Sequence, residues 1–105
     1  MLDLEQVKRA GRRLRAEHIE VRATDSLLSH ARVAVIVGKH GHTIVERNRL
    51  RRRLREIVRT NLIPGITGMD VVVRSFPSAY EATFAQLKTE VQRLAGELEK
   101  KEKLQ

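Results

Sequence analysis

The sequence is short and basic, and its composition excludes several classes of protein. Its 105 residues, 41% of them hydrophobic, suffice for one modest core and therefore one domain. The chain has no cysteine, which excludes disulfides and thiolate metal sites, and we find no signal peptide and no apolar run near the roughly 20 residues that span a bilayer. We therefore expect a cytoplasmic protein without a membrane segment.

The N-terminal residues predict a short helix. Over residues 3–10, Asp3 and Gln6 have the spacing of a capping box, and Gly11 can supply a left-handed stop. The basic residues near its end are as consistent with a solvated helix end and loop as with a binding surface: Lys8, Arg9, Arg12, Arg13 and Arg15.

Three strands are predicted after this helix. Residues 18–23 alternate apolar and polar side chains, which is typical of a strand with one wet face. Residues 33–37 form a continuous, largely β-branched run, which predicts a strand that is covered on both faces at the centre of the sheet. Residues 70–74 predict the third strand.

The most informative segment lies between the last two strands, where six arginines fall within the nine residues from Arg47 to Arg55. The glycines of residues 38–42 predict a tight loop before it, and a helix is expected from near Val45 to Ile63, because a proline follows. The helical period places mostly apolar residues on one face: Leu50, Leu54, Ile57, Val58 and Asn61. It places a polar stripe on the opposite face: Asn48, Arg52, Arg55 and Arg59.

The charge of this segment indicates an anionic partner. Residues 26–68 contain nine basic residues against only Glu46 and Glu56, and therefore hold seven of the eight net positive charges of the chain. A solvated helix face normally mixes signs, since like charges three or four positions apart repel. Arginine can also bind two phosphate oxygens at once, which lysine cannot. We therefore interpret the arginine-rich helix as a surface that binds a phosphate backbone, in preference to a helix face that only contacts solvent.

The C-terminal part predicts a long last helix. Ser78 and Glu81 have capping-box spacing after Pro77. An apolar stripe follows, which is expected to cover the sheet or, as an alternative, to pair in a short coiled coil: Phe84, Leu87, Val91, Leu94 and Leu98. We expect one domain over residues 1–98 and a frayed charged tail over residues 99–105.

No catalytic or metal-binding residue is predicted in the chain. Glu46 and Glu56 are ten positions apart and do not converge on one point, so they make a poor acid and base pair. His40 and His42 fit a polar loop better than a metal site, since no cysteine or nearby aspartate supports them.

These residues resemble one known family, the protein component of bacterial ribonuclease P. The similarity covers nearly the whole chain, and its signature lies in Lys39, Gly41, Ile44, the run from Arg47 to Arg52, Arg55, Glu56 and the strand over residues 70–74. The resemblance implies an α+β fold, a compact two-layer α/β sandwich similar to a domain of a ribosomal protein. It further implies the order helix-strand-strand-helix-strand-helix, with room for an extra short strand, and a left-handed βαβ crossover.

The resemblance also implies partners and a site. A member of this family binds a catalytic RNA and the 5′ leader of precursor tRNA, while Mg²⁺ is held by the RNA and no cofactor, membrane or protein oligomer is required. The RNA-binding residues that the resemblance implies are Lys39, Arg47, Asn48, Arg49, Arg51, Arg52 and Arg55, and the polar stripe of the helix adds Arg59. Candidate leader contacts are Leu4, Val7, Lys8, Arg12 and Arg13. Relatives usually present Phe where Leu4 and Val7 stand, and we expect the basic segment that usually precedes this helix in relatives to be absent here. The alternative is a general RNA- or DNA-binding module without a role in cleavage.

Overall fold

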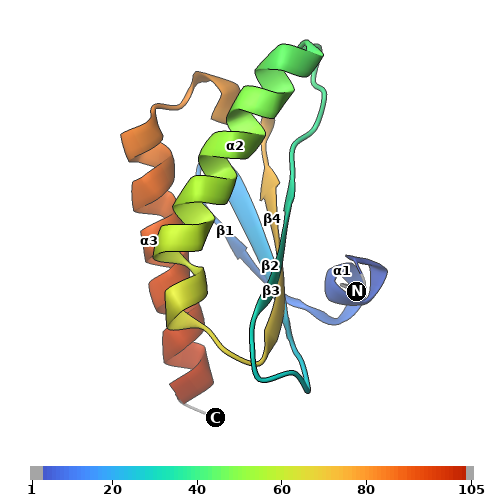
Figure 1. Cartoon of the computed structure of the whole chain (residues 1–105), viewed down its shortest axis with the longest axis vertical. Helices are drawn as coiled ribbons and strands as arrows, with labels where there is room; N and C mark the ends of the chain where they lie inside the picture. Colours follow the sequence, from blue (N-terminus) through green and yellow to red (C-terminus); the bar gives the residue numbers. More distant parts are fainter. Residues whose placement is uncertain (1–3, 104–105) are drawn as a thin grey trace.

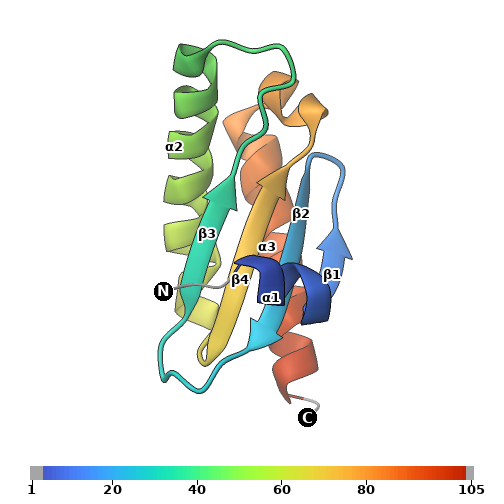
Figure 2. The same ribbon diagram turned by 90° about the vertical axis from the view of Figure 1, so that its right-hand side faces the viewer.

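A mixed four-stranded sheet organises the chain (Figure 2). The computed structural model describes residues 4–103. β2 pairs antiparallel with both β1 and β4, and β3 pairs parallel with β4, which gives the order β1-β2-β4-β3. The strands are β1 (Arg12–Arg15), β2 (Ile19–Asp25), β3 (Arg32–Ile36) and β4 (Met69–Ser75).

Two long helices cover one face of the sheet and one short helix lies on the other (Figures 1 and 2). In Figure 2, β3 and β4 point upward, β4 lies to the right of β3 and α2 lies behind them, so the β3–α2–β4 crossover is left-handed. The predicted α+β fold class is therefore confirmed, and β1 is the extra short strand. The helices are α1 (Leu4–Ala10), α2 (Ile44–Asn61) and α3 (Phe84–Lys103), with 3-10 turns η1 (Ile63–Gly65) and η2 (Pro77–Glu81).

The core lies between the sheet and the helices α2 and α3. The predicted apolar face of α2 is buried at Leu50, Leu54, Ile57 and Val58, as the helical period requires, and Asn61 at its end is partly buried. It packs with alternate residues of the strands and with the stripe of α3: Ile19, Val21, Val71, Val73, Leu87, Val91, Leu94 and Leu98. The amphipathic pattern of α2 therefore fixes which side of this helix faces solvent.

The prediction of the central strand is wrong. β3 lies at the edge of the sheet, and all five of its residues are only half-buried. β4 lies between β2 and β3, and its first five residues are buried. Residues 33–37 and 70–74 both contain β-branched runs typical of parallel strands, and periodicity alone does not reveal which of the two has a second neighbour.

The start of the last helix also differs from the prediction. Ser78 and Glu81 lie in the turn η2, and the capping box is formed instead by Thr83 and Gln86. The Thr83 amide donates to Gln86 Oε1 at 2.9 Å, and the Gln86 amide donates to Thr83 Oγ1 at 3.1 Å. Because α3 begins only after Thr83, Phe84 lies in its first turn and remains 46% exposed, outside the core. α3 continues to Lys103, and fraying of the tail stays a prediction.

Gly11 does not act as the predicted left-handed stop. Among the described residues, the glycines with positive φ are Gly41 (81°) and Gly68 (62°). Gly11 is needed for space, because a Cβ there would lie 2.3 Å from the carbonyl oxygen of Val7. The predicted cap at Asp3 lies outside the described residues.

Candidate nucleic-acid interface

The arginine-rich helix α2 begins at a well-defined cap. The Glu46 amide donates to Thr43 Oγ1 at 3.2 Å, and the Thr43 amide donates to Glu46 Oε1 at 2.9 Å. The hydrogen bond from the Thr43 backbone, followed by that from His42, holds the pKa of Glu46 below its ordinary value. Glu46 is thus an ionised cap at the positive end of the helix dipole. The sequence analysis missed this capping box, although Thr-x-x-Glu before a helix is its usual signal.

The loop before α2 is held in place by Tyr80. The Tyr80 hydroxyl donates to the carbonyl oxygen of Gly38 at 2.6 Å. Its ring stacks on that of His42, with centroids 3.7 Å apart and planes 7° apart. Burial raises the pKa of Tyr80, which favours the protonated phenol as donor. Lys39 is exposed on this fixed loop, close along the chain to the first arginines of α2.

The predicted polar stripe of α2 faces solvent. Asn48, Arg52, Arg55 and Arg59 are all exposed, and so are Arg49 and Arg53. The remaining two arginines of the run, Arg47 and Arg51, are half-buried. Arg51 Nη1 donates to Asn48 Oδ1 at 3.0 Å, whereas the buried Nε of Arg47 has no hydrogen-bond partner among the described residues.

Arg59 differs from the other exposed arginines because it is paired. Its Nη2 lies 2.7 Å from Glu56 Oε1, and the hydrogen bond lowers the pKa of Glu56 and raises that of Arg59. Four exposed arginines of α2 have no carboxylate partner in the described part of the chain. We call this set the arginine face: Arg49, Arg52, Arg53 and Arg55.

Two hollows border the arginine face. One, of about 470 Å³, is lined by Val45, Asn48, Arg49, Arg52 and Arg53. The other, of about 120 Å³, lies toward the loop and is lined by His42, Glu46, Arg49, Leu50, Arg53 and Tyr80. Arg53 lines both, yet the sequence analysis did not select it, because the helical period places it beside Leu50 and Leu54 at the edge of the apolar face.

A second basic surface lies on the opposite face of the sheet, the face that also carries α1 (Figure 2). We call it the surface beneath α1, after the layer in which it lies: Arg13, Glu20, Arg22, Val72 and Arg74. A hollow of about 80 Å³ there is lined by Glu20, Arg22, Val72 and Arg74. Glu20 is only 2% exposed, so the predicted wet face of this strand is wrong at this position. Glu20 Oε1 lies 2.6 Å from Arg22 Nε and 3.1 Å from Arg13 Nε. Burial alone would raise the pKa of Glu20, but the hydrogen bond from Arg22 and the surrounding arginine charges hold it below its ordinary value.

The candidate leader contacts are not brought together. Val7 is completely buried, whereas Leu4 is 36% exposed. Arg12 and Arg13 are neighbours in a strand and so project to opposite faces. Arg13 joins the surface beneath α1, while Arg12 lies on the side of the core. The side chain of Lys8 lies outside the described residues.

None of the described helices combines the length and the apolar character that a membrane-spanning helix needs.

A sequence-family model described as Ribonuclease P matches residues 3–99 of the chain. A "Ribonuclease P protein component" of Acidothermus cellulolyticus is 38% identical over 98 residues, which are 91% of this chain and 82% of that protein.

Solved structures of similar proteins share the fold. An RNase P protein from Thermotoga maritima, solved in complex with 1-(4-fluorophenyl)-2-thiourea, matches with a TM-score of 0.79 at 26% identity over 89% of this chain and 91% of that chain. An RNase P protein from Staphylococcus aureus matches with a TM-score of 0.78 at 22% identity over 89% and 88%.

Proposed function

The chain belongs to the ribonuclease P protein family, and from this premise we propose that it is the protein subunit that binds the catalytic RNA and the 5′ leader of precursor tRNA. In this role it promotes maturation of the tRNA 5′ end in the cytoplasm. The observation that carries the proposal is a rigid helix with one flank in the core and four unpaired arginines on the other. Such a row suits phosphates, because each guanidinium can donate two parallel hydrogen bonds to one phosphate.

We assign the arginine face to the catalytic RNA. Its charge has no carboxylate partner among the described residues, so phosphates would replace water and counterions around it rather than compete with an existing ion pair. Lys39 and Asn48 extend this surface toward the start of the helix. Arg59 is the weakest of the predicted contacts, since Glu56 already neutralises it.

We assign the surface beneath α1 to the single-stranded leader. Arg22 and Arg74 line the hollow there and can contact phosphates, whereas Val72, only 3% exposed, forms its apolar floor. The sequence has only two Phe and one Tyr, and Tyr80 is stacked on His42, so few platforms for base stacking remain. Recognition of the leader should therefore depend on backbone and shape more than on base identity.

The chain supplies binding rather than bond-breaking groups in this proposal. Of its carboxylates on α2, Glu46 caps the helix and Glu56 pairs with Arg59. The unpaired arginines around them would repel a magnesium ion, so we assign the metal that activates the water to phosphates of the RNA. The arginine face would screen repulsion between the RNA subunit and the precursor, which should lower the magnesium concentration that cleavage requires.

The test is reconstitution with the RNA subunit. We expect the protein to raise the rate of precursor cleavage at limiting magnesium, and the double variant Arg52→Glu/Arg55→Glu to lose most of this gain while remaining folded. The same rate with and without wild-type protein would refute the proposal. Equal affinity for duplex DNA and unrelated RNA at matched salt would favour the general nucleic-acid-binding module instead.

A further inference from the structure

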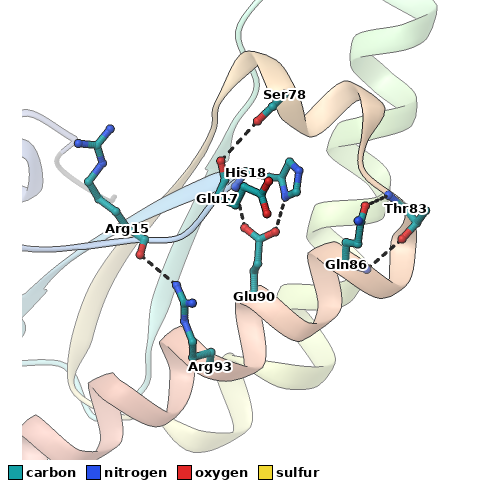
Figure 3. Close-up of polar contacts among 8 residues, drawn as sticks. All are labelled: Arg15, Glu17, His18, Ser78, Thr83, Gln86, Glu90 and Arg93. Atoms are coloured by element: carbon teal, nitrogen blue, oxygen red, sulfur yellow. Dashed lines mark hydrogen bonds and ion pairs between the residues drawn. The ribbon is translucent and has the colours of Figure 1, made fainter.

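A cluster of potential metal ligands lies at the turn between β1 and β2, where it meets α3 (Figure 3). Glu17 and His18 come from the turn, and Glu90 comes from the helix, 72 positions after His18. One ligand atom from each of the three residues lies within 4.8 Å of the other two. We propose that this cluster is a binding site for a divalent transition-metal ion, with Zn²⁺ as the best-fitting case.

The turn and helix are held in register by protein contacts. The His18 amide donates to Glu90 Oε1 at 2.7 Å, and His18 Nδ1 shares a hydrogen bond with Glu90 Oε2. The carbonyl oxygen of His18 accepts from the Phe76 amide at 2.8 Å, and that of Glu17 accepts from Ser78 Oγ at 3.4 Å. The ligand atoms of His18 and Glu90 are therefore held by protein contacts without an ion, whereas only the backbone of Glu17 is held and its carboxylate can move toward an ion.

The charge of the cluster is uncompensated by lysine or arginine. Within the described part of the chain, neither Glu17 nor Glu90 forms an ion pair with a basic side chain other than the imidazole of His18. This is unusual in a chain of net charge +8, where basic residues outnumber acidic ones by 21 to 13. Glu90 and His18 are also buried, at 9% and 8% exposure, and among the described residues only the two donors of His18 compensate the buried carboxylate of Glu90.

Space for an ion lies beside these groups. A hollow of about 330 Å³ is lined by Glu17, His18, Ala85, Gln86, Thr89 and Glu90. Four of these residues, Glu17, Ala85, Gln86 and Thr89, are exposed, so water can reach the hollow and complete the coordination. In a tetrahedral site with bonds of about 2.0–2.2 Å, two ligand atoms lie roughly 3.3–3.6 Å apart, so ligand atoms near the 4.8 Å limit would have to close by about 1 Å, which the exposed side chain of Glu17 allows.

The donor set selects the class of ion. One imidazole nitrogen and two carboxylates suit Zn²⁺ and similar borderline ions. Mg²⁺ prefers six oxygen ligands in regular geometry and gives up water reluctantly, so it fits an imidazole poorly. Binding through His18 Nδ1 would replace the proton that this nitrogen shares with Glu90. The ion would then tie the turn to α3, on a surface built by residues other than the arginine face.

The test measures metal binding by the full-length chain with isothermal titration calorimetry and thermal melts. We expect Zn²⁺ to bind with one-to-one stoichiometry and to raise the Tm, and Mg²⁺ at the same concentration to do neither. Glu17→Gln should weaken Zn²⁺ binding at least about tenfold, the loss that even outer partners of metal ligands cause. This variant is informative because the Glu17 carboxylate makes no hydrogen bond or ion pair within residues 4–103. Glu90→Gln should act likewise, although it also perturbs the contact with His18.

His30→Asn and His40→Asn serve as controls, since both histidines are exposed and lie outside the cluster. They should bind Zn²⁺ as the wild type does. Absence of Zn²⁺ binding to the wild type, unchanged affinity in Glu17→Gln, or loss of binding in either control would each overturn the proposal. In those cases His18 and Glu90 form a structural hydrogen bond only.

Discussion

The salt dependence of RNA binding should separate the free arginines of α2 from the paired one. The perturbation is Arg52→Ala, which removes an exposed guanidinium with no carboxylate partner among the described residues. Each lost phosphate contact should lower the slope of log K against log salt by about 0.7–0.9. When the salt concentration rises fourfold, the binding constant of the wild type should therefore fall by a factor roughly three times larger than that of the variant.

The matched control removes a charge pair from the same helix. The double variant Glu56→Ala/Arg59→Ala leaves the net charge unchanged, because it removes one negative and one positive charge that lie 2.7 Å apart. We expect its slope to equal that of the wild type. The assay is a filter-binding or anisotropy titration with the ribonuclease P RNA from 50 to 200 mM salt. An unchanged slope for Arg52→Ala, together with a lower slope for the double variant, would refute the assignment of the arginine face.

Three further expectations concern the fold. Leu54→Ala should cost about 2–5 kcal/mol in the free energy of unfolding measured in urea, because Leu54 is fully buried. Tyr80→Phe should cost about 0.5–1.5 kcal/mol by the same measurement, since it leaves the Gly38 carbonyl without its donor. The hydrogen bonds from Arg32, at 2.7 and 2.8 Å, hold the pKa of Asp70 below its ordinary 3.8. Their contribution to stability is thus present above that pH and lost as the pH falls through the lowered value, so the acid loss of stability in unfolding curves should be shallower for Asp70→Asn.

The helix that carries the candidate interface was predictable because its signals are local. The helical period alone identified Leu54 as buried and Arg52 as exposed, and the structure confirms both. Neighbours along a helix are three or four positions apart, so the sequence specifies the surface directly. The loop glycines and the following proline predicted its ends near Val45 and Ile63, close to the observed Ile44 and Asn61, although the first residue is set by the cap at Thr43.

Apart from the local capping boxes at Thr43 and Thr83, the parts that sequence reasoning missed depend on contacts between distant segments. The edge position of β3 follows from pairing with β4 on one side only. The surface beneath α1 requires the register that places Arg74 opposite Glu20 and Val72 opposite Arg22. Alternation within each strand indicated which residues share a face, but not which strands are neighbours. The cluster of His18 and Glu90 was hidden for the same reason.

The two basic surfaces differ in how their charge is compensated, and this difference argues for different roles. Beneath α1, Glu20 already neutralises part of the charge of Arg13 and Arg22, so a nucleic acid there gains less from counterion release. On α2, the arginine face has no such internal partner among the described residues. We therefore expect tight, strongly salt-dependent binding on α2, which is what the proposed role beside a permanent RNA subunit requires. We expect weaker binding beneath α1, which is what the proposed role with a substrate strand that must leave after each turnover requires.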